Sequence, residues 1–392
     1  MIYKIAEKLN DKLISIRREF HKIPELEFEE FKTSILICKY LDELGLKYEK
    51  LLNTGIVCNI KGKKGDGKTI LLRADIDALP ILEKNDLPYK SEHENLMHAC
   101  GHDVHITALL GVCMILKELD FDFCGNIKAV FQPAEEGRGG ALPMIEAGVM
   151  SSPKVDAALA LHVEPQSECG TLQYKNNSIM ASPDDFKIII KGKGGHGACP
   201  EDCINPIYVA AKLIEKISKI VPDNFKNKSD CVVSVCTINS GTQNNIIPDS
   251  LEITGTARSL DNETRKKIEK LLEQYTIDVC KTFSCSYDYI FNKMYPPVIN
   301  DNKINEILIK SANQLGCFKE IKEQEKPSMT GDDFSYFSNL VPSAYFKLGA
   351  GNKVINEPLH SPFFNVDEKC IKLGAAILTK TALNYLENNE NE

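Results

Sequence analysis

Thiol and imidazole side chains are concentrated in one short segment of the chain. The segment reads HACGHDVH and contains His98, Cys100, His102 and His105. Thiolate and imidazole ligands suit Zn, Mn, Co or Ni better than Mg or Ca. Cys100 and His102 are therefore predicted metal ligands, and the thiolate of Cys100 could bridge two ions. A buried thiol beside a helix start is the alternative for Cys100, and His105 fits a ligand, a packing residue or a support for a ligand.

Two adjacent carboxylates, Glu135 and Glu136, follow an apolar run at residues 129–131 and precede a glycine. Metal-dependent hydrolysis needs one carboxylate to hold the ion and another to take a proton from the attacking water. Neighbouring residues at a strand end can point in different directions and divide these tasks. A solvated surface pair is the other interpretation, but the preceding apolar run places this pair at the end of a strand.

Further polar residues follow other apolar runs. Asp75 and Asp77 come after residues 69–72, and His162 lies near the end of the run 157–163. His360 lies between two prolines, which fits a pre-shaped ligand loop. Ligands gather at the carboxyl ends of the strands in open parallel sheets, so we expect these side chains to converge on one edge of a sheet.

Apolar runs of strand length alternate with helical patterns in the first part of the chain. Alternating strands and helices predict an α/β fold, with a mostly parallel sheet flanked by helices. The predicted strands are residues 56–60, 69–72, 126–131 and 157–163, and the predicted helices are residues 5–20, 29–44, 103–119 and 141–147.

The pattern changes near residue 183 and returns near residue 296. The intervening segment has predicted strands at 186–190, 232–238, 251–257 and 287–291, and predicted helices at 206–220 and 263–279. Two helices with about four strands predict an inserted α+β domain. We therefore expect a split domain of residues 1–182 and 296–392 and a smaller domain of residues 183–295. The acidic tail at 387–392 is expected to be frayed.

Composition and charge exclude several classes of protein. The 392 residues carry 47 basic and 55 acidic side chains, a formal net charge of −8, which argues against nucleic-acid binding through a broad basic face. The sequence has no uninterrupted apolar window long enough for a membrane span and no signal-peptide core. We therefore expect a cytoplasmic protein without a membrane partner, with 14 cysteines as free thiols. Buried packing residues are predicted at Cys38, Cys58, Cys113, Cys124, Cys231, Cys236, Cys280, Cys285, Cys317 and Cys370.

A glycine-rich segment at residues 192–197 matches the spacing of a dinucleotide-binding loop. No helix opens directly after it, and no strand ends in an acidic residue about 20 residues further on, so we reject a dinucleotide site. The glycines instead predict a sharply turned loop that carries His196. Asn245 fits a plain turn, and Arg258 at a strand end fits either a surface residue or a clamp for a carboxylate.

Several segments together resemble the two-metal amidohydrolase and aminoacylase-type peptidase family. The most similar branch contains hippurate hydrolase, auxin–amino-acid-conjugate hydrolases and N-acetyldiaminopimelate deacetylase. HACGHD combined with QPAEEG is highly specific for this family. The matching segments extend from residue 17 to residue 364 and read RREFHKIPELEFEE, LLRADIDALP, HACGHDVH, VFQPAEEG, LHVEP, GKGGHGACPED, NNIIPD, MTGDDFSYF and PLHSPFF.

The resemblance implies two divalent metal ions, such as Zn, Mn, Co or Ni, and a role for each site residue. Glu135 would be the general base, Asp77 and Asp75 would orient the ligand loop, and Asp103 and His105 would give similar support. The implied metal ligands are Cys100, His102, Glu136, His162 and His360.

The resemblance also implies that the inserted domain is a ferredoxin-like lid that forms the interface of a homodimer. His196 and Asn245 of the facing subunit would polarise the scissile carbonyl and stabilise the oxyanion. Arg258 would bind the carboxylate of the substrate.

The predicted function is the metal-dependent hydrolysis of small-molecule N-acyl amino acids, with acetyl or aryl-acyl groups, to a carboxylic acid and an amino acid. Two alternatives remain open on the sequence. Cys100 could be a nucleophile with His102 or His98 as its base, or the protein could bind metal without catalysis.

Overall fold

The computed structural model describes residues 1–387 and consists of two compact units. The first unit comprises Met1–Asn177, Ile299–Glu325 and the chain from Asp333 onward. The second unit comprises Ser178–Val298 and Lys326–Asp332. All of the predicted frayed tail except Glu387 lies outside the described residues.

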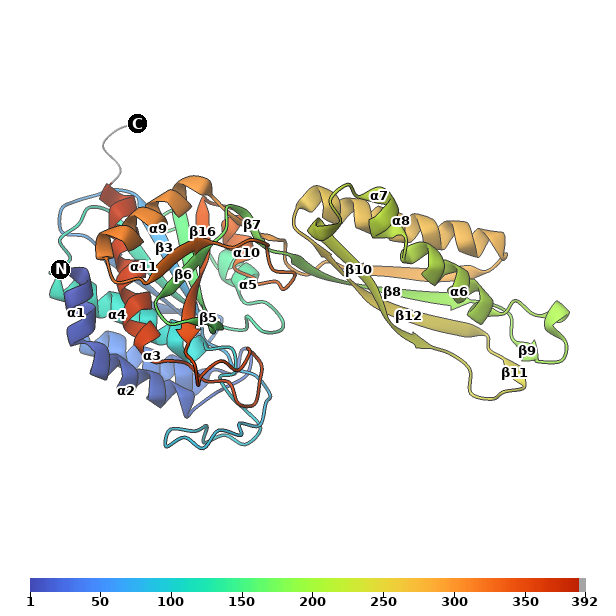
Figure 1. Ribbon diagram of the computed structural model, residues 1–392, viewed down its shortest axis with the longest axis horizontal. Coiled ribbons are helices and arrows are strands. Elements are labelled where there is room, and N and C mark those ends of the chain that lie inside the picture. Colours follow the sequence, from blue (N-terminus) through green and yellow to red (C-terminus); the bar gives the residue numbers. More distant parts are fainter. Residues whose placement is uncertain (388–392) are drawn as a thin grey trace. The chain divides into compact units, whose positions relative to one another are not determined.

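A sheet of eight strands forms the centre of the first unit (Figure 1). Four neighbouring strands run parallel to one another: β4 (Asn126–Gln132), β3 (Thr69–Asp75), β5 (Ala157–Glu168) and β16 (Ser343–Gly351). Antiparallel pairing extends this centre on one side to β2 (Gly55–Lys61) and β1 (Tyr48–Leu51), and on the other to β6 (Thr171–Tyr174), which β15 (Glu320–Glu323) follows in parallel. The predicted α/β fold with a mostly parallel sheet is confirmed.

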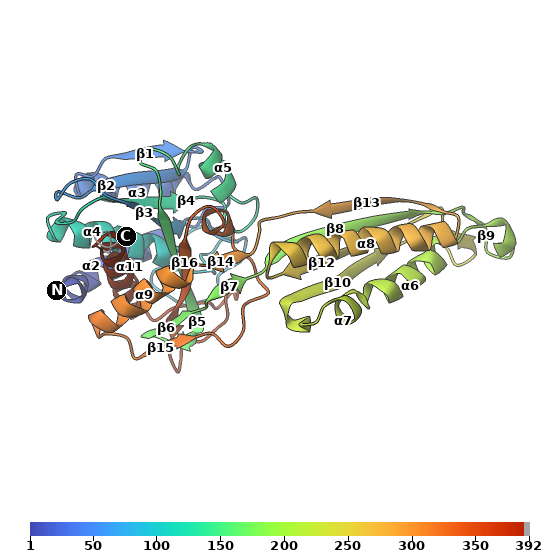
Figure 2. The same ribbon diagram turned by 90° about the horizontal axis from the view of Figure 1, so that it is seen from above.

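Helices bury the centre of this sheet. All residues of β3 are buried, as expected for a strand covered on both faces. Helices α4 (His102–Glu118) and α11 (Lys369–Glu387) lie side by side and contact β3 (Figure 2). Nearly the whole of α4 is buried, so the helix that begins at His102 is held firmly in the core. The other helices of this unit are α1 (Ile2–Lys8), α2 (Asn10–His21), α3 (Phe31–Glu43), α5 (Ala141–Glu146), α9 (Asn302–Leu315) and α10 (Ser335–Ser338).

The second unit contains a four-stranded antiparallel sheet with helices on one face. The strand order is β10 (Cys231–Asn239), β12 (Ser250–Ser259), β8 (Ser182–Lys191) and β13 (Ser286–Asn292). Residues of α6 (Pro206–Ile217) and α8 (Asn262–Thr282) share one core with this sheet, including Leu213, Ile253 and Leu272. Short elements complete the unit or lie at its boundaries: β7 (Asn177–Met180), β9 (Gly195–His196), η1 (Pro200–Asp202), α7 (Ile220–Asn224), η2 (Lys228–Asp230), β11 (Ile246–Ile247) and β14 (Val298–Asn300).

The structure corrects part of the prediction for the cysteines. All 14 are free thiols, but Cys124 and Cys236 are exposed rather than packed in a core. Cys124 lies in the loop before β4, and Cys236 lies where the register of β10 shifts against β12. A register shift changes which side chains face the core, and the pattern of apolar residues in the sequence does not reveal such a shift. Within the described residues, no helix is both long enough and apolar enough to cross a membrane.

The close approach of α4 and α11 predicts an unusual cost for a small substitution. A Cβ atom at Gly111 would lie 2.7 Å from the Cβ of Ala375. Gly111→Ala should lower the free energy of unfolding, because overpacking costs about 1–3 kcal/mol and outweighs the roughly 1 kcal/mol gained in helix propensity. Denaturant unfolding measures the change, and Ala375→Gly in the same chain should restore most of the loss. A Gly111→Ala variant as stable as wild type would contradict this packing.

Candidate metal centre

The carboxyl ends of neighbouring parallel strands bring the predicted ligands of the first unit together. Asp75 ends β3, and Glu135 and Glu136 follow the end of β4. His162 lies in β5, two residues beyond the last pairing of β5 with β3 at Ala160. The loop that leads into α4 supplies the remaining donors. Because these strands run in the same direction, their ends lie at one edge of the sheet.

All five predicted ligands belong to one cluster of side chains. The Sγ atom of Cys100 lies 3.4 Å from Nε2 of His162. The Oε1 atom of Glu136 lies 3.8 Å from Nε2 of His102 and 3.2 Å from Nε2 of His360. The donor atoms of Cys100, His102 and His162 all lie within 4.8 Å of one another, and so do those of Cys100, Glu136 and His360. The two sets share Cys100, which fits two ions that share one thiolate.

The hydrogen bonds of the histidines leave the cluster-facing nitrogens available to metal ions. The Nδ1 of His102 lies 2.9 Å from the carbonyl oxygen of Asp77, and the Nδ1 of His162 lies 2.8 Å from that of Val163. Each ring can therefore donate its Nδ1 proton to a carbonyl and turn Nε2 into the cluster, as metal-binding histidines do. Nε2 of His102 and Oε1 of Glu136 are buried without a hydrogen bond of good geometry. A divalent ion would satisfy both atoms.

The charges of the cluster favour a cation. Burial alone would lower the pKa of His102, but Asp75 and Asp77 raise it to about 10. A contact with Glu136 raises the pKa of His360 as well. Burial raises the pKa of the Cys100 thiol, and the nearby carboxylates of Glu136 and Glu135 raise it further. The carboxylates thus create a negative potential that protons or metal ions can neutralise.

Asp75 and His105 are close to the cluster, but their polar atoms are already paired. One oxygen of Asp75 lies 2.6 Å from Nδ1 of His105, and the other accepts a hydrogen bond from Arg73 at 2.6 Å. Nε2 of His105 accepts the N–H of Val163 at 3.0 Å. These bonds join β3, α4 and β5 and leave no ring nitrogen of His105 for an ion. The geometry favours a supporting role for His105 over a ligand role.

Asp77 connects two parts of the site that come from different elements. Its Oδ1 lies 3.2 Å from Nδ1 of His102, and its Oδ2 accepts the backbone N–H of Glu136 at 2.9 Å. One carboxylate therefore fixes the ring of a candidate ligand on α4 and the backbone of a candidate ligand after β4.

Asp103 contacts a different set of residues, which sequence reasoning did not single out. Its Oδ2 lies 2.6 Å from Nε of Arg17 and 2.8 Å from Nδ1 of His21, both on α2. Nε2 of His21 lies 3.2 Å from Glu83. Burial and Arg17 would lower the pKa of His21, but the two carboxylates raise it. This buried chain of charges joins α2 to the first turn of α4. Arg17 and His21 lie in RREFHKIPELEFEE, one of the segments that resemble the family, and no other feature of the sequence indicated their role.

Backbone conformation shapes the ligand loops. Gly101, between the candidate ligands Cys100 and His102, has a φ of 87°, and a Cβ atom there would lie 2.4 Å from Cγ2 of Val163. Only glycine fits this combination of conformation and close approach. Ala134 and His360 also have left-handed φ values, 56° and 64°, although they are not glycines. Such residues carry strain that the surrounding structure must support.

The other predicted site residues belong to the second unit. His196 pairs with Ile246 in the short ribbon of β9 and β11, and the carbonyl of Asn245 accepts the N–H of Gly197 at 2.8 Å. Both side chains are exposed. Arg258 lies in β12, where its Nη1 donates to the carbonyl of Asp184 at 3.1 Å. The structure thus brings His196 and Asn245 together on one ribbon and places Arg258 on a separate strand.

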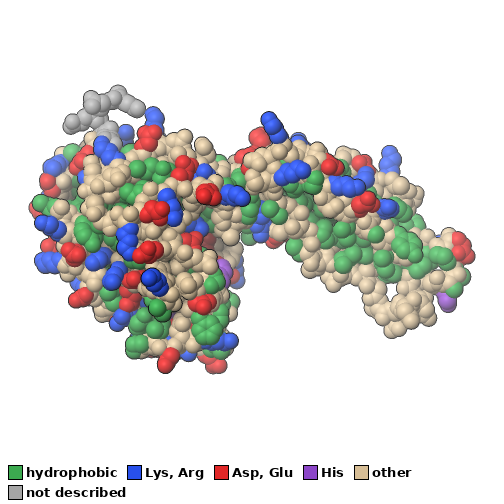
Figure 3. All heavy atoms as spheres, viewed as in Figure 1, with side chains coloured by type: hydrophobic (Ala, Val, Ile, Leu, Met, Phe, Trp, Pro, Cys, Tyr) green, Lys and Arg blue, Asp and Glu red, His purple; other side chains and the backbone are tan. Residues whose placement is uncertain are grey.

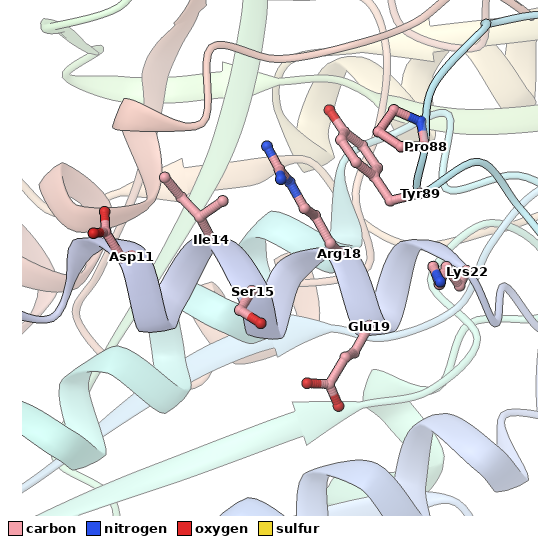
Figure 4. A pocket seen from close by; sticks show the side chains of 8 residues that line it. All are labelled: Asp11, Ile14, Ser15, Arg18, Glu19, Lys22, Pro88 and Tyr89. Atoms are coloured by element: carbon pink, nitrogen blue, oxygen red, sulfur yellow. The ribbon is translucent and has the colours of Figure 1, made fainter.

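A cavity of about 520 Å³ on the first unit does not contain the cluster (Figure 4). Its lining side chains come from α2, from Lys22 directly after that helix, and from Pro88 and Tyr89. Arg18 within it is paired with Glu368 and stacks over Tyr89, with 4.5 Å from the guanidinium carbon to the ring centroid. None of the candidate ligands lines this cavity.

Comparison with known proteins assigns the chain to a family. A model of peptidase family M20/M25/M40 matches residues 71–384. The chain belongs to this family. As a member of the M20 family, the protein is a metal-dependent hydrolase of amide bonds.

The relatives of this chain are named for several different activities. The chain is 39% identical to thermostable carboxypeptidase 1 of Saccharolobus solfataricus, over 94% of each sequence. It is 38% identical to N-acetyl-L-cysteine deacetylase of Bacillus subtilis, over 97% of this chain and 90% of the relative. Hippurate hydrolase of Campylobacter jejuni is 37% identical, over 95% and 96%. The predicted family resemblance is confirmed.

A solved structure agrees with the M20 fold. A dinuclear metal-binding M20 peptidase of Bacillus subtilis matches with a TM-score of 0.86 and 31% identity. The match covers 97% of this chain and 99% of the solved chain.

The contacts of Asp77 predict a selective loss of metal affinity. Asp77→Ala should weaken metal binding by about 10–100-fold, because His102 and Glu136 would lose a shared anchor. Competition with a chromogenic chelator measures the affinity.

Asp301 offers a matched control for this variant. Like Asp77, it accepts backbone N–H groups through its carboxylate. These come from Lys303 at 2.8 Å and Ile304 at 3.1 Å, at the start of α9. Asp301→Ala should cost about 1 kcal/mol of stability and leave metal affinity unchanged. An Asp77→Ala variant that binds metal as tightly as wild type would show that Asp77 does not hold the ligands.

Proposed function

We propose that this M20-family enzyme hydrolyses N-acyl amino acids to a carboxylic acid and an amino acid. The observation that carries the proposal is the cluster of five ligand-type side chains with Glu135 beside it. Donor atoms of His102, Glu135 and Glu136 all lie within 4.8 Å of one another, so a candidate base adjoins the candidate ligands.

Two divalent ions would be held by Cys100, His102, Glu136, His162 and His360. The dinuclear site of the related Bacillus subtilis peptidase supports two ions. The thiol and imidazole donors favour Zn, Mn, Co or Ni. When bound, the ions would supply the Lewis acidity that makes water acidic and polarises the amide carbonyl.

Glu135 would move the proton during hydrolysis. Its carboxylate would accept a proton from the attacking water and return it to the leaving nitrogen. The side chain is almost fully buried, which limits proton exchange with bulk solvent. Glu136, held through its backbone by Asp77, would stay on the metal while its neighbour acts as the base.

His196 and Asn245 would stabilise the negative charge that develops on the carbonyl oxygen. The Nδ1 of His196 accepts the N–H of Ala198 at 3.0 Å, so a neutral ring carries its proton on Nε2. That proton can be donated to an oxyanion. Arg258 would bind the substrate carboxylate through the rest of its guanidinium group, since its hydrogen bonds within the described residues use Nη1 alone.

We further propose that the inserted domain, residues 183–295, is a ferredoxin-like lid and dimerisation domain on the split domain of residues 1–182 and 296–392. The chain order β8, α6, β10, β12, α8, β13 and the antiparallel strand order support the ferredoxin-like assignment. Figure 3 shows hydrophobic side chains gathered on the second unit. The exposed hydrophobic residues of this unit include Ile207 and Tyr208 of α6 and Ile238 of β10. Such a patch favours a homodimer. A stable monomer in sedimentation would remove the cross-subunit role of His196.

The activities for which the relatives are named support a substrate in which an acyl group is joined by an amide bond to an amino acid with a free carboxylate. Carboxypeptidase, deacetylase and hippurate hydrolase activities all break an amide bond to an amino acid. We propose a small molecule with a carboxylate as the substrate. We propose neither a nucleic-acid partner nor a membrane partner. A cytoplasmic location remains part of this proposal, because reduced thiols such as Cys100 bind metal best in a reducing compartment.

The contact between Cys100 and His162 is the one observation that favours a cysteine nucleophile. A nucleophilic cysteine needs a lowered pKa, whereas burial and two carboxylates raise the pKa of Cys100. His98 is a poor base, because burial lowers its pKa to about 3. A metal-binding protein without catalysis would have no use for the buried carboxylate of Glu135. The hydrolytic metal centre therefore accounts for more of the cluster.

Metal removal tests the proposed chemistry. Dialysis against EDTA should abolish hydrolysis of N-acetyl and N-benzoyl amino acids, and Zn, Mn, Co or Ni should restore it, with released amino acid as the readout. Activity that survives when metal analysis shows none would contradict a metal-dependent reaction. A covalent acyl adduct on Cys100 would instead support the nucleophile.

Replacement of Glu135 separates proton transfer from metal binding. Glu135→Gln should lower kcat by about 10²–10⁴-fold, the usual contribution of a general base, and retain the wild-type metal content. Steady-state kinetics with metal analysis of the same sample measures both. If turnover stays near that of wild type, another group must be the base.

A further inference from the structure

Glu30 lies immediately before α3 but does not cap that helix. A short polar side chain at this position often accepts an N–H group of the first turn, but the side chain of Glu30 makes no such bond. Glu25 accepts those groups instead, from Lys32 at 3.1 Å and Thr33 at 2.9 Å. The carboxylate of Glu30 is therefore not needed to start α3.

Glu30 instead turns into the protein and contacts the loop of the general base. Its side chain is fully buried, and Oε1 accepts the N–H of Ala134 at 2.9 Å and that of Phe28 at 2.9 Å. Burial raises the pKa of Glu30 to about 7, which shows how costly its charge is at this place. Ala134 lies 104 residues from Glu30 in the sequence. Because a buried carboxylate is costly, its bond to the N–H of Ala134 indicates a specific structural role.

Ala134 is the residue that determines how the chain leaves β4 toward Glu135. Its left-handed φ of 56° is a strained conformation for a residue with a side chain. The hydrogen bond to Glu30 holds this strained residue, and the bond from Glu136 to Asp77 holds the other neighbour of Glu135. The base thus lies between two anchored backbone N–H groups, each bound by a buried carboxylate.

We propose that Glu30 is a positioning residue for Glu135, an inference that rests on the proposed function. Asp77 holds Glu136, and with it the metal side of the loop. Glu30 holds Ala134 and so sets the direction in which the carboxylate of Glu135 approaches the water. Loss of Glu30 therefore affects proton transfer more than metal binding.

Kinetics and metal content of Glu30 variants test this division of tasks. Glu30→Ala lowers kcat about 10–100-fold, the range typical of residues that orient an active group, with KM and metal per chain unchanged. Glu30→Gln retains an oxygen that can accept both N–H groups, and it recovers most of kcat. Glu30→Asp keeps the charge but is one methylene too short to reach Ala134. It shows the same loss and replaces the alanine variant if that variant does not fold.

Glu25 provides the matched control from the same segment. Glu25→Ala removes a carboxylate that caps α3 without touching the loop of the base. It should lower the midpoint of thermal unfolding, because α3 loses a cap, and leave kcat unchanged. Mass spectrometry of bound metal and thermal unfolding accompany the kinetics of each variant.

The outcomes separate this inference from the proposed function. An active wild type with unchanged kcat in Glu30→Ala overturns the positioning role alone. Parallel loss of metal and kcat in Glu30→Ala overturns the positioning role too, because Glu30 would then support the metal site as a whole. An equal loss of kcat in Glu25→Ala would also overturn it. A metal-loaded wild type that hydrolyses no N-acyl amino acid overturns the proposed function and the inference with it.

Discussion

Asp77 joins two segments on which the candidate metal centre depends. Its carbonyl and Oδ1 face the ring of His102, while Oδ2 holds the backbone of Glu136. These two candidate ligands come from the start of α4 and from the loop after β4, and Asp77 contacts both of them. The parallel strands bring both segments to the same edge of the sheet, and the packing of Gly111 against α11 keeps the buried helix α4 in place.

The buried polar groups of the first unit fall into two kinds. Asp75, Asp103 and His105 have partners at short distances, and their bonds join strands and helices to each other. His102 and Glu136 each keep a buried atom without a hydrogen bond, although such an atom costs free energy. The contrast agrees with supporting roles for Asp75, Asp103 and His105 and with ligand roles for His102 and Glu136, and unpaired buried atoms also occur at residues that are not proposed ligands, such as His98. It also accounts for His105, whose spacing from His102 fitted either role.

The central strands and the strand-end side chains could be predicted because both leave a local pattern. A strand buried on both faces is an apolar run, as residues 69–72 are, and polar residues directly after it must lie at its end. The marginal strands β1, β6 and β15 are short and partly exposed, so they lack such a run. The return of Lys326–Asp332 to the second unit was not predicted, since contacts between distant segments leave no local periodicity. The same reason hid the bonds of Asp103 to Arg17 and His21.

We propose that Cys100 binds metal as a thiolate within a two-ion site. X-ray absorption spectroscopy of the zinc-loaded protein tests it directly, because sulfur and nitrogen ligands scatter at different distances. We expect a zinc–sulfur shell at about 2.3 Å and two ions per chain, with the sulfur shell absent from Cys100→Ala. A spectrum of the wild-type protein with nitrogen and oxygen ligands alone, at about 2.0–2.1 Å, would contradict it.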